Sequence, residues 1–159
     1  MTTPALETYN GTEYQLALPT HWERHVDQPG PPVALLALEP DAEDDVFRAN
    51  VVLTIENIDD GERWQETAGA ALSEHLREYL LLDEERLPIA DDDTVESGVR
   101  RLFHHHIPGS GAITGEQWAW VAGDRGFTLT ASTATFDYDD KADLFAAIAD
   151  RFRSQRKPS

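Results

Sequence analysis

Two stretches of the chain, residues 33–38 and 50–55, are apolar at nearly every position rather than at every second one. Successive side chains of a β-strand point to opposite faces of its sheet. A strand that is apolar throughout is therefore typical of the middle of a sheet that is covered on both faces. These two stretches predict a central sheet between two covering layers.

The rest of the first half supplies one more strand and a helix. Residues 13–18 alternate between polar and apolar and end at Pro19, which is typical of a strand. Residues 59–62 have the form of a helix N-cap, and they open a stretch of about twenty residues with helical periodicity. Its apolar stripe consists of Trp64, Ala68, Ala71, Leu72, Leu76, Tyr79 and Leu80.

The second half predicts an antiparallel meander followed by a helix. Residues 86–98 indicate a short edge strand and a loop. Glycine-containing turns then separate three strand-like stretches, residues 99–107, 112–121 and 127–136. Asp137 precedes a terminal helix as its cap. The apolar side of that helix consists of Leu144, Phe145, Ile148 and Phe152.

This order of elements predicts an α+β fold. We expect a three-layer α/β/α sandwich, in which a mostly antiparallel sheet of six or seven strands has helices on both faces. A length of 159 residues fits one domain. We therefore expect residues 1–159 to form a single domain with its core within about residues 13–153.

Charge is the strongest compositional feature. Acidic residues outnumber basic residues by 30 to 13, which gives a formal net charge of −17 at pH 7. Nucleic acid is excluded as a partner, because its binding depends on Lys and Arg displacing counterions from phosphates. No apolar run approaches the ~18 residues of a membrane span. The charge leaves two interpretations: solubility through self-repulsion, or an acidic face that steers a basic partner.

Cysteine usage and the first residues bear on location. The chain contains no cysteine, which excludes disulfides, thiol catalysis and a lipid-modified cysteine. Its first residues lack the basic and apolar stretches of a secretory signal. We therefore expect a cytoplasmic location.

Motifs of well-known enzyme classes are absent. The sequence has no G-x-S-x-G elbow, no Walker loop, no G-x-G-x-x-G and no H-E-x-x-H. The aspartate run at 91–93 lacks the glycine and the distal glutamate of a calcium loop. We therefore assign no catalytic residue, no metal ligand and no cofactor.

The run of three histidines at 104–106 is the most conspicuous candidate for a metal site. On a strand, His104 and His106 point to the same face and His105 points to the other. Two imidazoles at this spacing can hold two positions of a zinc or copper site, but such a site needs a third ligand. The alternative interpretation is a polar strip on a half-exposed strand.

Trp118 and Trp120 likewise share one face of their strand. If that face is exposed, two indoles form a contact patch of the kind enriched at interface hot spots. If it is covered, they are core residues. Arg48 is a further candidate binding residue, because it either pairs with the acidic residues of 41–45 or stays free for a partner.

Sheet dimensions favour an exposed face in the late meander. Helices of about 20 and 16 residues span roughly 30 and 24 Å, and a sheet of this size is about 30 Å wide. One helix on each face therefore leaves part of the sheet uncovered. We predict that the face carrying His104, His106, Trp118 and Trp120 is at least partly accessible and forms the contact surface.

Several pieces of the chain, taken in order, resemble a known family. They are Leu18-Pro-Thr-His-Trp22, Phe47-Arg-Ala-Asn-Val-Val-Leu53, the long helix ending Leu80-Leu-Leu-Asp-Glu84, Ile113-Thr-Gly-Glu-Gln-Trp118, Phe127-Thr-Leu-Thr130 and the amphipathic terminal helix. In this order they are similar to LpqN-type actinobacterial proteins of the PsbP-like fold, which the Ran-binding Mog-type proteins share. The resemblance implies a three-layer α/β/α sandwich that binds other macromolecules and has no shared catalytic residues.

These observations favour a non-enzymatic protein-binding or adaptor domain with a strongly acidic surface and a protein partner, a basic one if the charge steers it. Enzymatic activity stays open. The alternatives are a metal-dependent hydrolase with a histidine-lined site, and an acidic immunity or inhibitor protein that mimics phosphate. Ligand carriage between helix and sheet is a further alternative. The sequence does not identify the partner or the oligomeric state.

Overall fold

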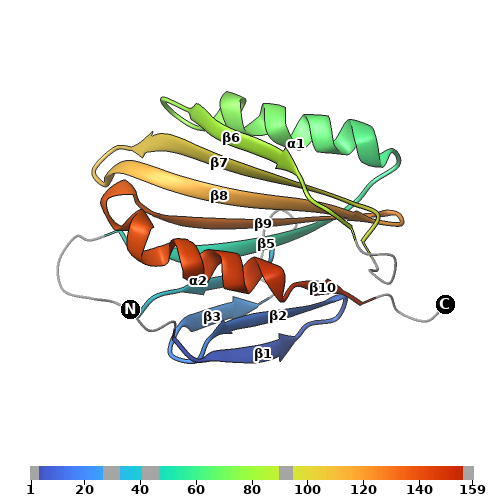
Figure 1. The fold of residues 1–159 in the computed structure, drawn as a ribbon, viewed down its shortest axis with the longest axis horizontal. Coiled ribbons are helices and arrows are strands. Elements are labelled where there is room, and N and C mark those ends of the chain that lie inside the picture. The colour runs from blue at the N-terminus through green and yellow to red at the C-terminus, as the bar shows by residue number, and fades with distance from the viewer. Residues whose placement is uncertain (1–3, 27–32, 41–46, 90–94, 156–159) are drawn as a thin grey trace.

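The computed structural model describes residues 4–26, 33–40, 47–89 and 95–155. Within these ranges the chain forms two α-helices, one short 3-10 helix and ten strands (Figure 1). The helices are α1 (Gly61–His75), η1 (Thr135–Asp137) and α2 (Tyr138–Asp150). The strands are β1 (Leu6–Asn10), β2 (Tyr14–Pro19), β3 (Glu23–Val26), β4 (Val33–Leu38), β5 (Asn50–Asn57), β6 (Leu80–Arg86), β7 (Ser97–Ile107), β8 (Gly111–Ala122), β9 (Arg125–Ala134) and β10 (Arg153–Ser154).

The strands form two antiparallel sheets. The main sheet has seven strands in the order β3-β4-β5-β9-β8-β7-β6, and a small sheet has the order β1-β2-β10. Figure 1 shows α1 on one face of the main sheet and α2, with the small sheet beside it, on the other. The predicted α+β sandwich with helices on both faces of a mostly antiparallel sheet is confirmed.

The hydrophobic core lies between the main sheet, α2 and the small sheet. The residues that α2 contributes to it are Leu144, Phe145, Ile148 and Ala149. Trp120 of β8 stacks on Phe152 with ring centroids 4.3 Å apart, and Phe127 of β9 meets the same ring at 5.3 Å. Aromatic stacking of this kind adds to the large apolar area that these rings bury.

The layer beneath α1 has a different character, because buried polar side chains lie beside apolar ones such as Phe103 and Ala119. Gln65 is the one buried residue of this helix, and its Nε2 donates to the carbonyl of Ala119 at 2.8 Å. The residues of the sheet that are buried on this side include Arg101 and Gln117. Helix α1 packs mainly on β7 and β8, so it leaves the matching face of β4 and β5 half-buried.

The course of the chain after α1 differs from the sequence prediction. Instead of running for about twenty residues, the helix ends at His75, and Leu76 is already extended with φ −98° and ψ 132°. Glu78 then takes a left-handed conformation with φ 53°, which turns the chain back toward the sheet. Residues 80–84 were predicted to be the end of the helix, but they instead belong to the edge strand β6. The run of leucines continued the helical stripe, but the backbone turn separates it from α1.

Candidate functional site

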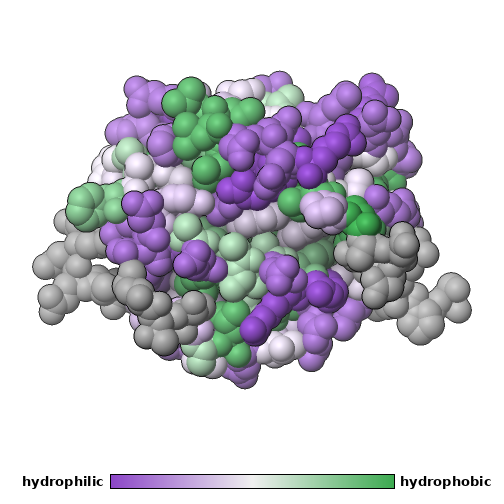
Figure 2. Space-filling view, in the orientation of Figure 1, coloured by the Kyte–Doolittle hydropathy of each residue, from purple (hydrophilic) through white to green (hydrophobic). Residues whose placement is uncertain are grey.

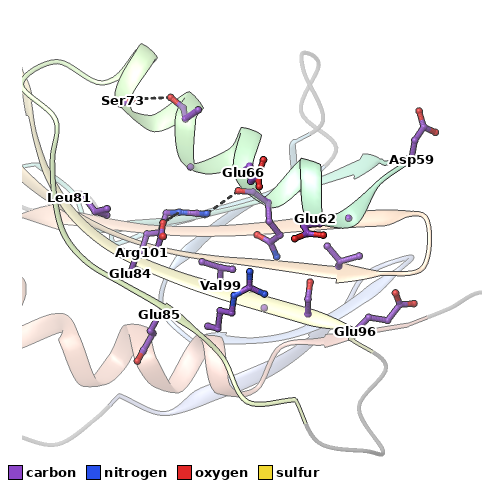
Figure 3. A pocket seen from close by; sticks show the side chains of 18 of the residues that line it. Asp59, Glu62, Glu66, Ser73, Leu81, Glu84, Glu85, Glu96, Val99 and Arg101 are labelled. Atoms are coloured by element: carbon purple, nitrogen blue, oxygen red, sulfur yellow. Dashed lines mark hydrogen bonds and ion pairs between the residues drawn. The ribbon is translucent and has the colours of Figure 1, made fainter.

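A groove of about 1070 Å³ lies between α1 and the strands β6 and β7 (Figure 3). We call it the α1 groove. Its walls come from the sheet-facing side of α1, from the last two strands of the sheet, and from the chain before β7. Six acidic and two basic residues line it: Asp59, Glu62, Glu66, Glu84, Glu85, Glu96, Arg86 and Arg101.

Arg101 forms the floor of the α1 groove. It is 4% exposed, and its Nε donates to Oε2 of Glu84 at 2.7 Å. Its two terminal nitrogens donate to the carbonyl of Gln65 at 3.0 Å and to Oε1 of Gln117 at 3.3 Å. All of its nitrogens therefore have acceptors, which is what a buried cation requires.

A glycine on α1 makes room for this guanidinium. A Cβ atom at Gly69 would lie 3.0 Å from Nε and Nη2 of Arg101, closer than side chains normally approach. Glycine inside a helix costs about 0.5–1 kcal/mol relative to alanine. Its position over Arg101 explains why a glycine occurs in the middle of α1.

The carboxylates of α1 that line the groove differ from that of Glu84. Glu84 is bound to Arg101, whereas Glu62 and Glu66 have no ion-pair partner among the described residues. Figure 3 shows both side chains at the groove, one helical turn apart on α1. These two carboxylates are available to a cationic group that enters the groove.

Gln65 adds an unmet acceptor to the same wall. The residue is 8% exposed, and no described residue donates to its Oε1. A buried acceptor without a donor costs about 1–3 kcal/mol. This atom is shielded from solvent, so the acceptors that α1 offers to an entering group are the carboxylates of Glu62 and Glu66.

Strand β6 borders the groove and is the outermost strand of the main sheet. All seven of its residues are exposed, and the fractions for Leu80, Leu81 and Leu82 are 57%, 42% and 45%. Figure 2 shows hydrophobic surface gathered at upper left, where β6 begins in Figure 1. The strand continues as Asp83-Glu84-Glu85-Arg86, so its first half is apolar and its second half is mostly acidic.

The pairing of β6 with β7 sets the direction of the acidic side chains. Glu84 pairs with Arg101 and shares its face, toward α1. Asp83 and Glu85 lie on the other face, where their carboxylates are 3.3 and 3.4 Å from Arg100. In Figure 3 the side chain of Glu85 accordingly points away from α1. The exposed edge therefore carries carboxylates on both faces of the sheet.

Trp118 and Trp120 share the predicted face, but they are not exposed. Their exposed fractions are 5% and 7%, so the predicted accessibility of the two indoles is wrong. Helices alone are too short to cover the width of the sheet, but Phe152, which follows α2, stacks on Trp120 and covers it. Both indoles line a second cavity of about 350 Å³ on the α2 face, which also includes Arg100 and Glu116.

His104 and His106 share a face as predicted and are partly exposed. His104 pairs across the strands with Leu80, which places it beside the apolar start of β6. Nδ1 of His106 lies 3.9 Å from a carboxylate oxygen of Glu78. Among the described residues, no group of three His, Cys, Asp or Glu is arranged to hold a metal ion. The third ligand of a histidine site is thus not found in that part of the chain.

Arg48 lies far from these residues, next to the opposite edge of the main sheet. Its Nε donates to the carbonyl of Glu39 at 2.8 Å, and its Nη2 is 2.7 Å from a carboxylate oxygen of Glu23 on β3. The hydrogen bond between the side chains of Arg48 and Glu23 lowers the pKa of the Glu23 carboxyl group. The predicted pairing with the acidic residues of 41–45 falls outside the described residues.

A buried polar network on the α2 face is separate from the α1 groove. The carboxylate of Glu116 accepts hydrogen bonds from Nε of Arg100 and, at 3.0 Å, from the hydroxyl of Tyr138. Burial, together with the neighbouring Glu116 carboxylate, raises the pKa of Tyr138 to about 12. Because Tyr138 is the first residue of α2, this network fastens the helix to the sheet.

The sequence prediction missed the α1 groove and β6. One signal was present: three leucines followed by three acidic residues do not continue an amphipathic helix, and they suit an edge strand that is protected by charge. The pairing of Arg101 with Glu84 gave no signal, because it depends on the register between β6 and β7.

Comparison with known proteins identifies the fold. The cyanobacterial PsbP protein of Synechocystis (CyanoP) is similar, with a TM-score of 0.66, 20% identity, and coverage of 94% of this chain and 92% of that one. LpqN of Mycobacterium tuberculosis gives 0.71 at 12% identity, with 96% and 91% covered. A Pseudomonas aeruginosa protein of unknown function gives 0.64 at 11% identity, with 97% and 99% covered.

No protein-family model matches the chain, and neither does any curated protein sequence. The structural matches nevertheless cover more than nine-tenths of each chain. The chain therefore has the PsbP-like fold, as the resemblance of its sequence motifs implied. No described helix is long and apolar enough to cross a membrane.

Proposed function

We propose that this chain is a non-catalytic protein-binding domain, and that it contacts a basic partner protein through the α1 groove and β6. One observation carries the proposal: the edge strand β6, all of whose residues are exposed, lies beside a groove into which α1 contributes two unpaired carboxylates. An open sheet edge and a line of charge are both features that recognise another protein chain.

The arrangement of polar groups in the groove supports binding rather than catalysis. Each nitrogen of Arg101 is already bound to an acceptor within the protein, so this buried cation is held in place by the fold. The hydroxyl of Ser73 donates to the carbonyl of Ala70 within its own helix. A nucleophilic serine instead needs a base within hydrogen-bond reach.

Proteins of the same fold supply the second line of support. LpqN is described as involved in cell envelope biogenesis, and the Pseudomonas aeruginosa protein as a putative regulator. A fold alone does not determine function, so these descriptions bear only on the class of role. Both descriptions are consistent with a binding domain.

Charge favours a basic partner. The formal net charge of −17 accelerates encounters with a basic protein, and salt weakens that effect. At physiological ionic strength the Debye length is about 8 Å, so only carboxylates close to the contact add to its stability. Glu62 and Glu66 are the two groove carboxylates on α1 that meet this condition without an internal partner.

Selection from a random peptide library tests the proposal without a known partner. The library is passed over the wild-type chain, over Glu62→Gln with Glu66→Gln, and over Glu74→Gln with Asp143→Asn. The last pair changes the same charge at exposed helix positions outside the groove. We expect basic peptides to be enriched on the wild type and on the control pair but not on the groove variant. Equal enrichment on all three proteins, or none on any, contradicts the proposal.

A further inference from the structure

We propose that β6 is itself the docking edge: an extended basic segment of the partner joins the main sheet as an eighth strand along residues 83–86, with cationic side chains over the α1 groove. This inference rests on the proposed function and specifies how the partner is held. Strand addition to an open edge takes its affinity from backbone hydrogen bonds and its specificity from alternate side chains.

The backbone of β6 is open on one side. Among the described residues the strand pairs with β7 alone, and it is last in the order of the main sheet. Its outer N–H and C=O groups therefore have no strand partner in that part of the chain. Free edge groups of this kind are a template for another strand.

Irregular pairing limits where a segment fits. The register between β6 and β7 shifts between Leu81 and Asp83, which makes Leu82 a bulged residue. From Asp83 to Arg86 the pairing is regular. A bulge bends the strand and interrupts an edge, so the regular ladder of residues 83–86 is the part that an added strand can follow. The exposed leucines before it offer contact to an apolar side chain at one end of the segment.

The alternation of side chains matches a segment with basic residues at every second position. An added strand presents its side chains alternately to the α1 face and to the α2 face. On the α1 face these side chains meet Glu84 and the unpaired carboxylates of Glu62 and Glu66. Guanidinium groups in that row supply positive charge and hydrogen-bond donors to these exposed carboxylates.

Charge also argues against a second copy of this chain as the occupant. Antiparallel pairing of two copies along residues 83–86 places Glu84 opposite Glu85 in both central pairs, while the two outer pairs join Asp83 to Arg86. Like charges directly opposite each other destabilise a strand pair. A basic segment of another protein removes this repulsion, so it fits the edge better than a copy does.

A set of short peptides tests strand addition directly. The probe is acetyl-Val-Arg-Val-Arg-Val-amide, which places both arginines on one face of an extended strand. A citrulline peptide keeps the shape and removes the charge. A peptide N-methylated at its three central amides keeps the charge and removes backbone donors. Affinity is measured by calorimetry on the wild type, on Glu62→Gln with Glu66→Gln, and on Glu74→Gln with Asp143→Asn.

We expect the arginine peptide to bind the wild type and the control pair equally, and to bind at least tenfold more weakly to the groove variant. Citrulline and N-methylation should each weaken binding at least tenfold. If N-methylation leaves the affinity unchanged while the groove variant loses it, strand addition is wrong and the proposed basic partner stands. If the citrulline peptide binds as tightly as the arginine peptide, the proposed contact between the guanidinium groups and the groove carboxylates is wrong. Dimerisation of the chain alone through β6, seen in sedimentation, overturns the choice of occupant.

Discussion

Arg101 and Glu84 form an ion pair across β7 and β6 in which only one partner is buried. Nε and Oε2 are 2.7 Å apart, the guanidinium lies in the floor of the α1 groove, and the carboxylate is about half exposed. This pair holds the edge strand to the sheet on the α1 side. It also neutralises Glu84, whereas Glu62 and Glu66, the acidic groups that α1 contributes to the groove, have no ion-pair partner among the described residues.

Replacing the buried cation should destabilise the protein. Arg101→Met leaves the carbonyl of Gln65 and Oε1 of Gln117 without their donor. We expect the free energy of unfolding to fall by about 2 kcal/mol, because lost partners of buried polar groups cost about 1–3 kcal/mol. Urea denaturation measures the change. Arg63→Met removes the same charge from an exposed position of α1 and should change stability by less than about 0.5 kcal/mol. Equal effects of the two variants would show that Arg101 is not a structural anchor.

The indoles on the α2 face should behave as core residues. Trp120→Ala removes the ring that stacks on Phe152, and the loss of a large buried aromatic costs about 3–5 kcal/mol. Phe136→Ala is a suitable control, because Phe136 is 96% exposed. Thermal and urea unfolding should show a large loss for the first variant and almost none for the second. A loss below about 1 kcal/mol for Trp120→Ala would contradict the burial of this ring.

The hydroxyl of Tyr138 should lose its proton only at high pH, and this should make the stability of the protein depend on pH in the alkaline range. Its pKa of about 12 exceeds the ordinary 10, because burial and Glu116 both disfavour the phenolate. The unfolded chain therefore loses this proton first, and stability should fall as the pH rises from about 10 to 12. Difference absorbance of tyrosinate between the wild type and Tyr138→Phe isolates this group. Glu116→Gln should lower its pKa, and an unchanged value would show that Glu116 is not a cause.

His105 should contribute acid sensitivity. Burial lowers its pKa below the ordinary 6.5, with a smaller effect from His106. The unfolded chain binds a proton at this site at a higher pH than the folded chain does. Stability should therefore fall as the pH drops below about 6.5. His105→Phe keeps a ring beside Phe103 and should lose less stability between pH 7 and 5 than the wild type loses. An identical pH dependence in both proteins would exclude His105 as the source.

The sequence was sufficient to predict the layers, because they follow from side-chain periodicity. The apolar runs at 33–38 and 50–55 predicted strands within a sheet, and the glycine turns predicted the meander of β7, β8 and β9; these elements are confirmed. The prediction that both faces of these two strands are covered was only partly right. Helix α1 packs mainly over β7 and β8, so the α1 face of β4 and β5 is half-buried. The short strands β1, β3 and β10 carry too few residues for a periodic signal.

The candidate site depends on features that periodicity does not report. The end of α1 is set by the left-handed backbone at Glu78, which a leucine-rich stripe does not reveal. The register of β6 brings Glu84 to Arg101, and the glycine at position 69 leaves room for the guanidinium of Arg101 beneath α1. Composition predicted an acidic chain, but the assignment of acidic groups to one groove required the tertiary structure.

Amide hydrogen exchange of the wild type, with and without the arginine peptide, shows directly whether β6 is the docking edge. We expect the β6 amides, which border the open edge, to gain at least tenfold protection when the peptide is bound. The amides of β3, at the other edge of the same sheet, provide the internal control and should not change. Protection that appears at β3 or elsewhere, with β6 unchanged while the peptide is bound, would exclude β6 as the docking edge.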